Sequence, residues 1–211
     1  IANPNCSTIQ MVAALHPIRE KFGISAIKVA TYQSVSGAGK AAVDELKQQT
    51  LATLNHQDVK PSVFPHSIAF NNLPQIGSFD GTGFTSEEQK MRRETKKIFG
   101  DDEISVSAFC VRTATLNGHS EAVWVTTRDK ADQKQVLSAL KTAQGVKILD
   151  NASNCEYPLT TKASGEDPVY VGRILQDPDD EKTWMMWIVA DNIRKGAALN
   201  GIQIAEKIFG I

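Results

Sequence analysis

Strand-like segments come in directly adjacent pairs in this chain, with no helix-length segment between the two members of a pair. Residues 104–114 and 121–128 alternate roughly between apolar and polar side chains on either side of the short connection LNGHS. Residues 169–175 and 183–190 form a second such pair. Strands that follow one another closely are typical of antiparallel sheets. With helical segments elsewhere in the chain, the pattern predicts an α+β fold with a mixed, largely antiparallel sheet.

The remaining segments divide between helices, strands and loops. Residues 24–33 are apolar with β-branched side chains and predict a further strand, and VKIL near residue 148 predicts a short one. Helical patterns occupy residues 7–15, 40–54, 86–99, 132–144 and 192–209, and polar, loop-like stretches occupy 56–82 and 151–167. Pro17 is expected to disturb the first helix. The third should be capped by Thr85 or Ser86 and should end at Gly100.

Composition and charge exclude several classes of partner. The chain has 211 residues, 41% of them hydrophobic, and a formal net charge of −1, so it has no basic footprint for nucleic acid or an anionic membrane. Its apolar runs, such as residues 184–190, are far shorter than the roughly 20 residues of a membrane span. Three cysteines without C-x-x-C spacing predict neither a disulfide framework nor a metal site, and they favour a cytoplasmic location.

Cys6 precedes a helix and follows Asn-Pro-Asn, which is an unusual setting for a core residue. A thiol at a helix N-terminus is near the positive end of the macrodipole and near unpaired N–H groups, which favour the thiolate. We therefore expect the pKa of Cys6 to be lower than that of Cys110 or Cys155. The same N–H groups, with the Asn5 side chain, could hold an oxyanion. The alternative is a small buried residue, the commonest environment of a free cysteine.

A nucleophilic cysteine needs an acid/base partner, and one of the four histidines is well placed. His16 is roughly 15 Å from Cys6 along the helix axis and is too far away. His119 follows a glycine-containing turn and opens a strand, from which its side chain could reach a cleft. Arg112 lies seven residues earlier, near the end of an apolar strand. A histidine at the end of a sheet and an arginine paired with a surface acid remain alternatives.

Two further motifs allow both a functional and a purely structural interpretation. GAGKAA, residues 37–42, fits Gly-x-Gly-x-x-Ala, but no acid follows at the end of a second strand, and Lys40 does not complete a P-loop. It predicts a glycine-rich helix start that could still contact a phosphate, and the chain has no Rossmann domain. Glu87, Lys90 and Arg93 share one helix face. Such charged faces are usually solvated.

Five stretches, taken in order, carry a resemblance to a known family. They are IANPNCSTIQMVAAL, TYQSVSGAGKAA, SEEQKMRRETKKI, CVRTATLNGHSEAVWV and DNIRKGAALNGIQIAE. Together they resemble the aspartate-semialdehyde dehydrogenases from the first residue nearly to the last, and most closely the bacterial branch with Asn-Pro-Asn-Cys-Ser-Thr. The N-acetyl-glutamyl-phosphate reductases are related and share the chemistry, but not the TYQSVSGAG or SEEQKMRRETKKI stretches.

The resemblance implies a two-domain enzyme of which this chain is one half. An NADP-binding domain would precede residue 1, and residues 1–190 would form the catalytic and dimerisation domain of a homodimer. That domain would have helices packed on one face of its sheet, as in glyceraldehyde-phosphate-dehydrogenase-type enzymes. Residues 191–211 would form a helix that packs on the nucleotide-binding domain. Without that domain we expect weak NADPH binding at best and no activity.

The resemblance also implies a reaction and a set of catalytic residues. The reaction is the reductive dephosphorylation of L-aspartyl 4-phosphate to L-aspartate 4-semialdehyde with NADP as cofactor, in lysine, methionine, threonine and diaminopimelate biosynthesis. Carried over by position, Cys6 attacks the acyl phosphate and forms a thioester, which hydride from NADPH reduces. His119 is the acid/base catalyst, and Gln33 orients the reacting thiol or acyl group.

The remaining roles concern substrate and cofactor. Arg112 would hold the substrate carboxylate, Glu87 the amino group and Lys90 the phosphate, with Asn5 also at the substrate. Ser36 and Gly37 would lie beside the cofactor. No metal, nucleic acid or membrane is implied. Three alternatives stay open: a non-catalytic dimerisation module, a related acyl-phosphate reductase, and a Cys-His hydrolase or transferase that uses Cys6 and His119 without a cofactor.

Overall fold

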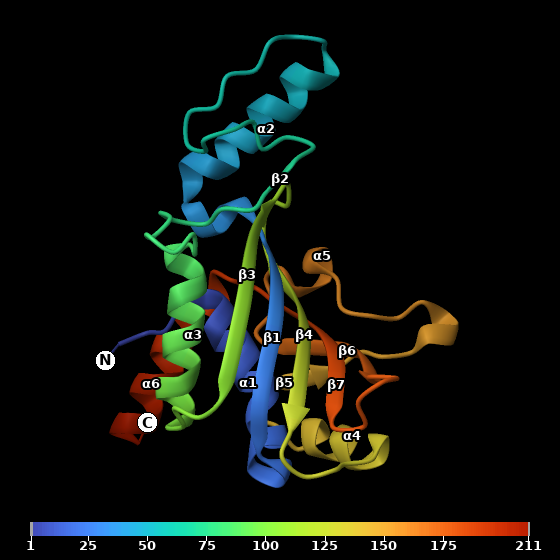
Figure 1. Ribbon diagram of the computed structural model, residues 1–211. Coiled ribbons are helices and arrows are strands. Elements are labelled where there is room, and N and C mark those ends of the chain that lie inside the picture. Colours follow the sequence, from blue (N-terminus) through green and yellow to red (C-terminus); the bar gives the residue numbers. More distant parts are fainter. Residues whose placement is uncertain (1, 211) are drawn as a thin grey trace.

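A single seven-stranded sheet organises the molecule. The computed structural model describes residues 2–210, and its strands lie in the order β2-β3-β1-β4-β7-β6-β5 (Figure 1). The strands are β1 (Ile24–Gln33), β2 (Asn72–Leu73), β3 (Ser105–Thr113), β4 (His119–Thr127), β5 (Val146–Ile148), β6 (Val169–Gln176) and β7 (Thr183–Ala190). The pairs β1–β3 and β5–β6 are parallel and the other four are antiparallel. The expected mixed, largely antiparallel sheet is confirmed.

Two helices have the predicted bounds, 40–54 and 86–99, whereas the closing helix, expected over 192–209, begins only at Leu199, and a short helix lies within the expected loop 151–167. The helices are α1 (Cys6–Phe22), α2 (Lys40–Leu54), α3 (Ser86–Phe99), α4 (Gln133–Lys141), α5 (Thr160–Ala163) and α6 (Leu199–Phe209), with short turns η1 (Val35–Ala38), η2 (Ala152–Asn154) and η3 (Arg194–Ala198). Thr85 caps α3 through a capping box with Glu88, and Gly100 ends it in a left-handed conformation. Both expectations for this helix are confirmed.

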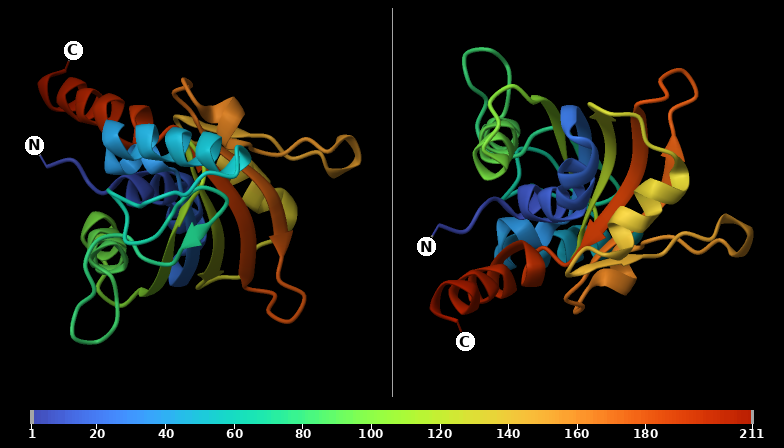
Figure 2. Two further views of the ribbon diagram at one scale, coloured as in Figure 1. Left: turned by 90° about the horizontal axis from the view of Figure 1, so that it is seen from above. Right: turned by 90° about the horizontal axis from the view of Figure 1, so that it is seen from below.

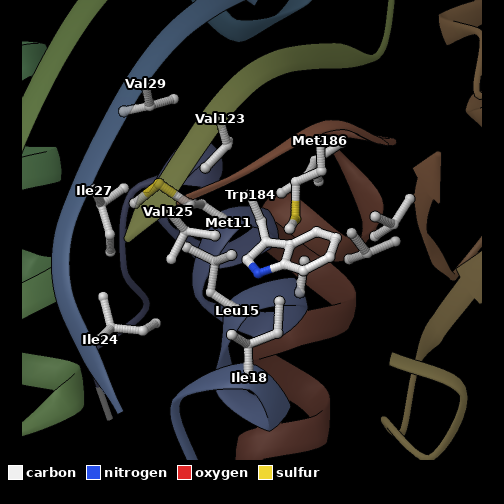
Figure 3. Packing of buried hydrophobic residues seen from close by; sticks show 14 of the residues in the cluster. Met11, Leu15, Ile18, Ile24, Ile27, Val29, Val123, Val125, Trp184 and Met186 are labelled. Atoms are coloured by element: carbon white, nitrogen blue, oxygen red, sulfur yellow. The ribbon is translucent and has the colours of Figure 1, made fainter. Parts of the chain in front are cut away.

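The central strands bury one face and expose the other. On β4, Val123 and Val125 are buried whereas Trp124 between them is 37% exposed. Met11, Leu15 and Ile18 of α1 gather around the buried Trp184 on the covered face (Figure 3). In Figure 1, β3, β1 and β4 lie in front of α1, and no helix crosses in front of them. The opposite face therefore stays open, with large apolar side chains on it: Tyr32, Phe109, Trp124 and Leu175.

The first helix runs on where the sequence predicts a disturbance. Pro17 lies inside α1, which continues to Phe22. A proline in a helix interior removes one backbone hydrogen bond and costs about 3 kcal/mol or more. Ile18 and Phe22 are both buried in the main core, and their burial offsets that cost. The expected end of the helix near residue 15 is therefore wrong.

The connection LNGHS joins two strands that do not pair with each other. β1 lies between β3 and β4, parallel to the first and antiparallel to the second. Further along, residues 40–73 leave the sheet as α2 and a long loop, and they return through β2 with a small core of their own around Val35, Leu46 and Ile68. At the other end of the chain, both views in Figure 2 show α6 projecting away from the sheet.

Candidate active site

Three neighbouring strands bring Gln33, Arg112 and His119 together at one end of the sheet. Gln33 ends β1 and is in register with Arg112 on β3, while His119 opens the antiparallel neighbour β4. All three side chains are on the face that α1 covers, and their exposed fractions are 1%, 6% and 0%. Burying polar side chains without good hydrogen-bond partners costs free energy, so the burial of these three needs an explanation.

The helix N-terminus that carries Cys6 is fixed at this same end of the sheet by Asn5. The Asn5 Oδ1 accepts from the Ser7 and Thr8 backbone N–H groups at 3.0 and 3.1 Å, which caps α1. Its Nδ2 donates to Glu87 Oε1 at 2.7 Å. Gln33 Nε2 donates to the same Glu87 oxygen at 3.2 Å. One carboxylate thus links the nucleophile's helix to strand β1.

A second acid on α3 and a glycine of η3 complete the setting of the thiol. Glu94 Oε2 accepts from the Asn5 backbone N–H at 2.7 Å. Gly196 lies in η3, a π-helical turn, so close to α1 that a Cβ added to it would stand 2.9 Å from Cys6 Cβ. Only a residue without a side chain allows this approach. Residues from both ends of the chain therefore define the position of the thiol.

Burial raises the pKa of the Cys6 thiol to about 11, and the nearby Glu87 carboxylate adds to the increase. The Ser7 backbone N–H and the Arg112 guanidinium act in the opposite direction but do not outweigh the first two. Burial also raises the pKa of Cys110. The pKa of Cys6 is lower than that of Cys110, as expected, because burial raises the pKa of Cys110 further. The helix N-terminus does not bring the pKa of Cys6 below its ordinary value, however, because burial and the Glu87 carboxylate outweigh it.

His119 has one ring nitrogen engaged and one without a partner. The Ser34 backbone N–H donates to Nδ1 at 3.1 Å, and Ser34 Oγ lies 3.1 Å from the same atom. Nε2 is buried and has no hydrogen-bond partner among residues 2–210. Burial and the Arg112 guanidinium lower the pKa of His119 to about 3. The imidazole is therefore neutral.

Gly37 forms the wall next to His119 and Arg112. A Cβ on Gly37 would stand 3.0 Å from Arg112 Nη1 and 3.1 Å from His119 Nε2. Its neighbour Ser36 donates to Asn117 Oδ1 at 2.9 Å and receives a hydrogen bond from Asn192 Nδ2 at 3.0 Å. The turn η1 is thus anchored beside the buried side chains of Arg112 and His119.

The structure leaves Lys90 outside this group. Glu87 is buried, whereas Lys90, three residues later on α3, is exposed. In the described part of the chain, its ammonium forms no ion pair and no hydrogen bond. Arg93 on the same helix face is also exposed. Of the candidate residues, the structure brings Cys6, Asn5, Gln33, Glu87, Arg112, His119 and Gly37 together, with Ser36 beside them.

Two further buried polar side chains near His119 are not predicted from the sequence. Glu121 shares the covered face of β4 with His119, is 0% exposed, and has no hydrogen-bond partner for either carboxylate oxygen within residues 2–210. Gln10, on α1, donates from Nε2 to the His119 carbonyl oxygen at 3.4 Å. Burial raises the pKa of Glu121 well above its ordinary value. The alternation of β4 could have revealed Glu121, because residues 119, 121 and 123 share a face.

Two other classes of site do not occur in the described part of the chain. Residues 2–210 contain no group of three or more His, Cys, Asp or Glu side chains that could hold a metal ion. Across the same residues, every helix is too short or too polar to span a membrane.

Comparisons with known proteins agree on one family. Residues 15–195 match the family model described as semialdehyde dehydrogenase, dimerisation domain. The aspartate-semialdehyde dehydrogenase of Aquifex aeolicus is 52% identical over 207 residues, which are 98% of this chain and 61% of that protein. A crystal structure of aspartate semialdehyde dehydrogenase II complexed with ASA from Vibrio cholerae matches with a TM-score of 0.94 and 47% identity, over 98% of this chain and 61% of that one.

A more distant relative has the same fold. The crystal structure of aspartate semialdehyde dehydrogenase with NADP from Candida albicans matches with a TM-score of 0.72 and 27% identity, over 98% of this chain and 56% of that one. The chain therefore spans about three fifths of the length of the relatives that it matches.

Proposed function

The chain belongs to the semialdehyde dehydrogenase dimerisation-domain family, and from that premise we propose that it is the catalytic and dimerisation part of an NADP-dependent aspartate-semialdehyde dehydrogenase. The proposed reaction is the reductive dephosphorylation of L-aspartyl 4-phosphate to L-aspartate 4-semialdehyde. The observation that supports it most is a cysteine at a capped helix N-terminus close to the buried side chains of Gln33, Arg112 and His119. Among these buried side chains, His119 Nε2 has no hydrogen-bond partner within the described residues.

Charges of both signs near Cys6 suit an amino-acid substrate. Arg112 is 6% exposed and uses Nη1 to donate to the Ser34 carbonyl oxygen at 2.7 Å, which leaves its other N–H groups for a carboxylate. Glu87 Oε1 accepts from Asn5 and Gln33, and no described residue donates to Oε2. We assign Arg112 to the substrate carboxylate, Glu87 to the amino group and the exposed Lys90 to the phosphate.

Substrate binding would help to activate the thiol. The Glu87 carboxylate raises the pKa of Cys6, and a bound substrate ammonium would neutralise that carboxylate. The thiolate then attacks the acyl carbon, and the carbon–oxygen bond to the phosphate breaks. This forms a thioester on Cys6, the step for which covalent catalysis needs an activated nucleophile. Gln33, fixed through Glu87, would orient the acyl group.

The residues present fit one end of the cofactor. Gly37 provides a wall without a side chain beside His119 Nε2 and Arg112 Nη1, where a planar ring could approach. A reduced nicotinamide, when bound, supplies hydride to the thioester carbon. Ser36 is held by Asn117 and Asn192 and would keep this wall in place. The phosphate-binding turn and the ribose-binding acid would belong to a separate nucleotide-binding domain.

The exposed apolar surfaces of the sheet and of α6 suggest which partners the chain binds. We propose that the uncovered sheet face, which includes Phe109 and Trp124 at 58% and 37% exposed, forms the interface of a homodimer. Residues 1–190 would then be the catalytic and dimerisation domain. In residues 191–211, α6 exposes Ile202 and Phe209, which a nucleotide-binding domain would cover. The bacterial relatives and the free cysteines favour cytoplasmic amino-acid biosynthesis: lysine, methionine, threonine and diaminopimelate.

The reverse reaction tests this function. The full-length protein is incubated with semialdehyde, phosphate and NADP, and NADPH absorbance is followed. We expect Cys6→Ala to abolish turnover, because no other group can form the thioester, and we expect Cys155→Ala, an exposed cysteine, to leave it unchanged. Wild-type protein that reduces no NADP, or Cys6→Ala protein that retains wild-type turnover, would refute the proposal.

A further inference from the structure

A buried carboxyl group lies one step further into the fold than His119. Glu121 follows His119 by two residues on β4, so the two side chains share the face that α1 covers. The next residue on this face, Val123, packs in the main hydrophobic core. Glu121 is 0% exposed and therefore lies between the candidate active site and the apolar core, where water cannot solvate a charge.

No cation compensates the charge that an ionised Glu121 would carry. Burial raises the pKa of Glu121 well above its ordinary value, and no basic side chain of residues 2–210 acts on it. Its neighbours across the sheet, Thr31 on β1 and Ile188 on β7, are uncharged. The ionisable groups coupled to it are the thiols of Cys6 on α1 and Cys110 on β3, whose thiolates would repel a carboxylate. Such surroundings favour the neutral acid.

Gln10 is the polar side chain that can pair with this acid. It lies on α1 one helical turn after Cys6, is 0% exposed, and donates from Nε2 to the His119 carbonyl oxygen at 3.4 Å. Gln10 is also close enough to Glu121 to lower its pKa as a hydrogen-bond donor, although no hydrogen bond of normal geometry joins the two side chains. The Gln10 amide thus lies between the helix of the nucleophile and strand β4.

The unpartnered atoms of these two side chains become complementary once the acid keeps its proton. Three oxygen atoms lack a partner within residues 2–210, namely Gln10 Oε1 and both carboxyl oxygens of Glu121. If Glu121 is ionised, all three are acceptors. A neutral carboxyl group instead donates its O–H to the amide oxygen and accepts an amide N–H at its other oxygen, so all three atoms gain a partner. The second N–H of Gln10 remains on the His119 carbonyl oxygen.

We propose that Glu121 is a neutral carboxylic acid paired with the Gln10 amide, and that this acid–amide pair fixes α1 against β4 and so positions Cys6 at the site. The pair lies one helical turn from the thiol, about 5.4 Å along the axis. A displacement of about 1 Å in a catalytic group can cost about 10²-fold in rate. The positioning role rests on the proposed function, whereas the protonation state of Glu121 does not.

Infrared spectroscopy measures the proton on Glu121 without turnover. We would record spectra of the full-length wild type and of Glu121→Gln at about pH 7, where an ordinary glutamate is ionised, and take the difference. We expect the wild type to contribute the C=O stretch of a protonated carboxylic acid, shifted in protein prepared in D₂O. Glu166→Gln, at an exposed glutamate, is the control and should remove carboxylate bands instead. Loss of carboxylate bands in Glu121→Gln would overturn the proposal.

Exchanging the two side chains tests the positioning role. Gln10→Met and Glu121→Met remove the pair with little change in volume. Each should lower kcat in the semialdehyde assay by roughly 10–10²-fold, with KM nearly unchanged because the substrate-binding groups are retained. The double variant Gln10→Glu/Glu121→Gln rebuilds the pair with its roles reversed. It should recover most of the lost kcat and show the C=O stretch of a protonated acid again.

Each outcome of the exchange decides the role of the pair. A reversed double variant that is unfolded, or as slow as the methionine variants, would overturn the positioning role, and so would methionine variants with wild-type kcat. If the methionine variants do not fold, the activity of the reversed variant decides alone. A wild-type enzyme without activity would refute the proposed function and with it the positioning role, but the infrared result on Glu121 would still stand.

Discussion

Two buried polar clusters in this molecule are built in opposite ways. Beneath the loop after α2, Glu45 accepts from Ser62 Oγ at 2.7 Å and from the backbone N–H groups of Ser62 and Val63. Gln49 donates to Glu45 at 2.8 Å and accepts from the Ile68 backbone at 2.8 Å. Every polar atom of these two side chains that the fold buries has a partner among residues 2–210.

The cluster around Cys6 is also buried, but several of its polar atoms have no hydrogen-bond partner among the described residues. His119 Nε2, both carboxylate oxygens of Glu121, Gln10 Oε1 and Ser7 Oγ are buried without a hydrogen bond inside residues 2–210. Unsatisfied buried polar groups are rare in folded proteins, because each costs roughly 1–3 kcal/mol. Burial of polar side chains alone therefore does not identify a functional site. The satisfied cluster stabilises a loop, whereas the other leaves both donors and acceptors without a partner among the described residues.

The same substitution in the two clusters should give opposite results, and the larger effect is expected at Glu45. Burial alone would raise the pKa of Glu45, but hydrogen bonds from Ser62 and Val63 lower it below its ordinary value. Glu45→Gln replaces a charged acceptor of several N–H and O–H groups with a neutral amide. We expect a loss of about 2–3 kcal/mol in the free energy of urea unfolding, with kcat unchanged.

The pH dependence of this loss follows from the lowered pKa. The stabilisation by Glu45 is fully present above the unfolded-state pKa and disappears as the pH falls through the folded-state pKa. The deficit of Glu45→Gln should therefore shrink in acid. Asp44→Asn, at the exposed neighbour that pairs with Lys40, serves as the control and should change stability far less than Glu45→Gln, because an exposed ion pair contributes little. Equal losses of stability in Glu45→Gln and Asp44→Asn would contradict the role of Glu45 in stabilising the loop.

Glu121→Gln should have the smaller effect, with the opposite pH dependence. Because burial raises the pKa of Glu121, the folded state holds a proton that the unfolded state loses as the pH rises above about 4.5. Wild-type stability therefore falls over that range, and glutamine has no such proton to lose. We expect Glu121→Gln to gain stability relative to wild type between about pH 5 and 7 in urea unfolding.

The thiol provides a second readout for Glu121. The Glu121 carboxylate contributes to the raised pKa of Cys6. Iodoacetamide labelling of Cys6 at a series of pH values should therefore give a lower midpoint in Glu121→Gln than in wild type. An unchanged midpoint would show that Glu121 carries no charge where Cys6 ionises and would contradict this coupling.

Sequence patterns predicted the elements better than their contacts. The bounds of β1, α2, α3 and β7 follow from alternation, caps and glycine stops, all of which act within a few residues. The extension of α1 past Pro17 depends on packing of Phe22 in a core that only the assembled sheet creates. Local sequence patterns therefore do not show whether packing against the rest of the fold extends a helix or strand.

The same division holds at the site. The chemical types of Cys6, Arg112 and His119 mark them as candidates in the sequence. The pKa of Cys6 could not be predicted, because it is raised by burial in the assembled fold and by Glu87, which lies 81 residues further along the chain. The tie between Ser34 and His119 joins residues 85 positions apart and uses a backbone N–H, which no sequence motif reveals. The close approach of Gly196 to Cys6 depends equally on the tertiary fold.

A trapped acyl group tests most directly whether the unsatisfied cluster is catalytic. The full-length protein is incubated with L-aspartyl 4-phosphate in the absence of NADPH, digested, and examined by peptide mass spectrometry. We predict one aspartyl group per chain, on the peptide that contains Cys6, removable by hydroxylamine and accompanied by one equivalent of released phosphate. An adduct on the peptides of Cys110 or Cys155, or no adduct in enzyme that turns over, would contradict the account.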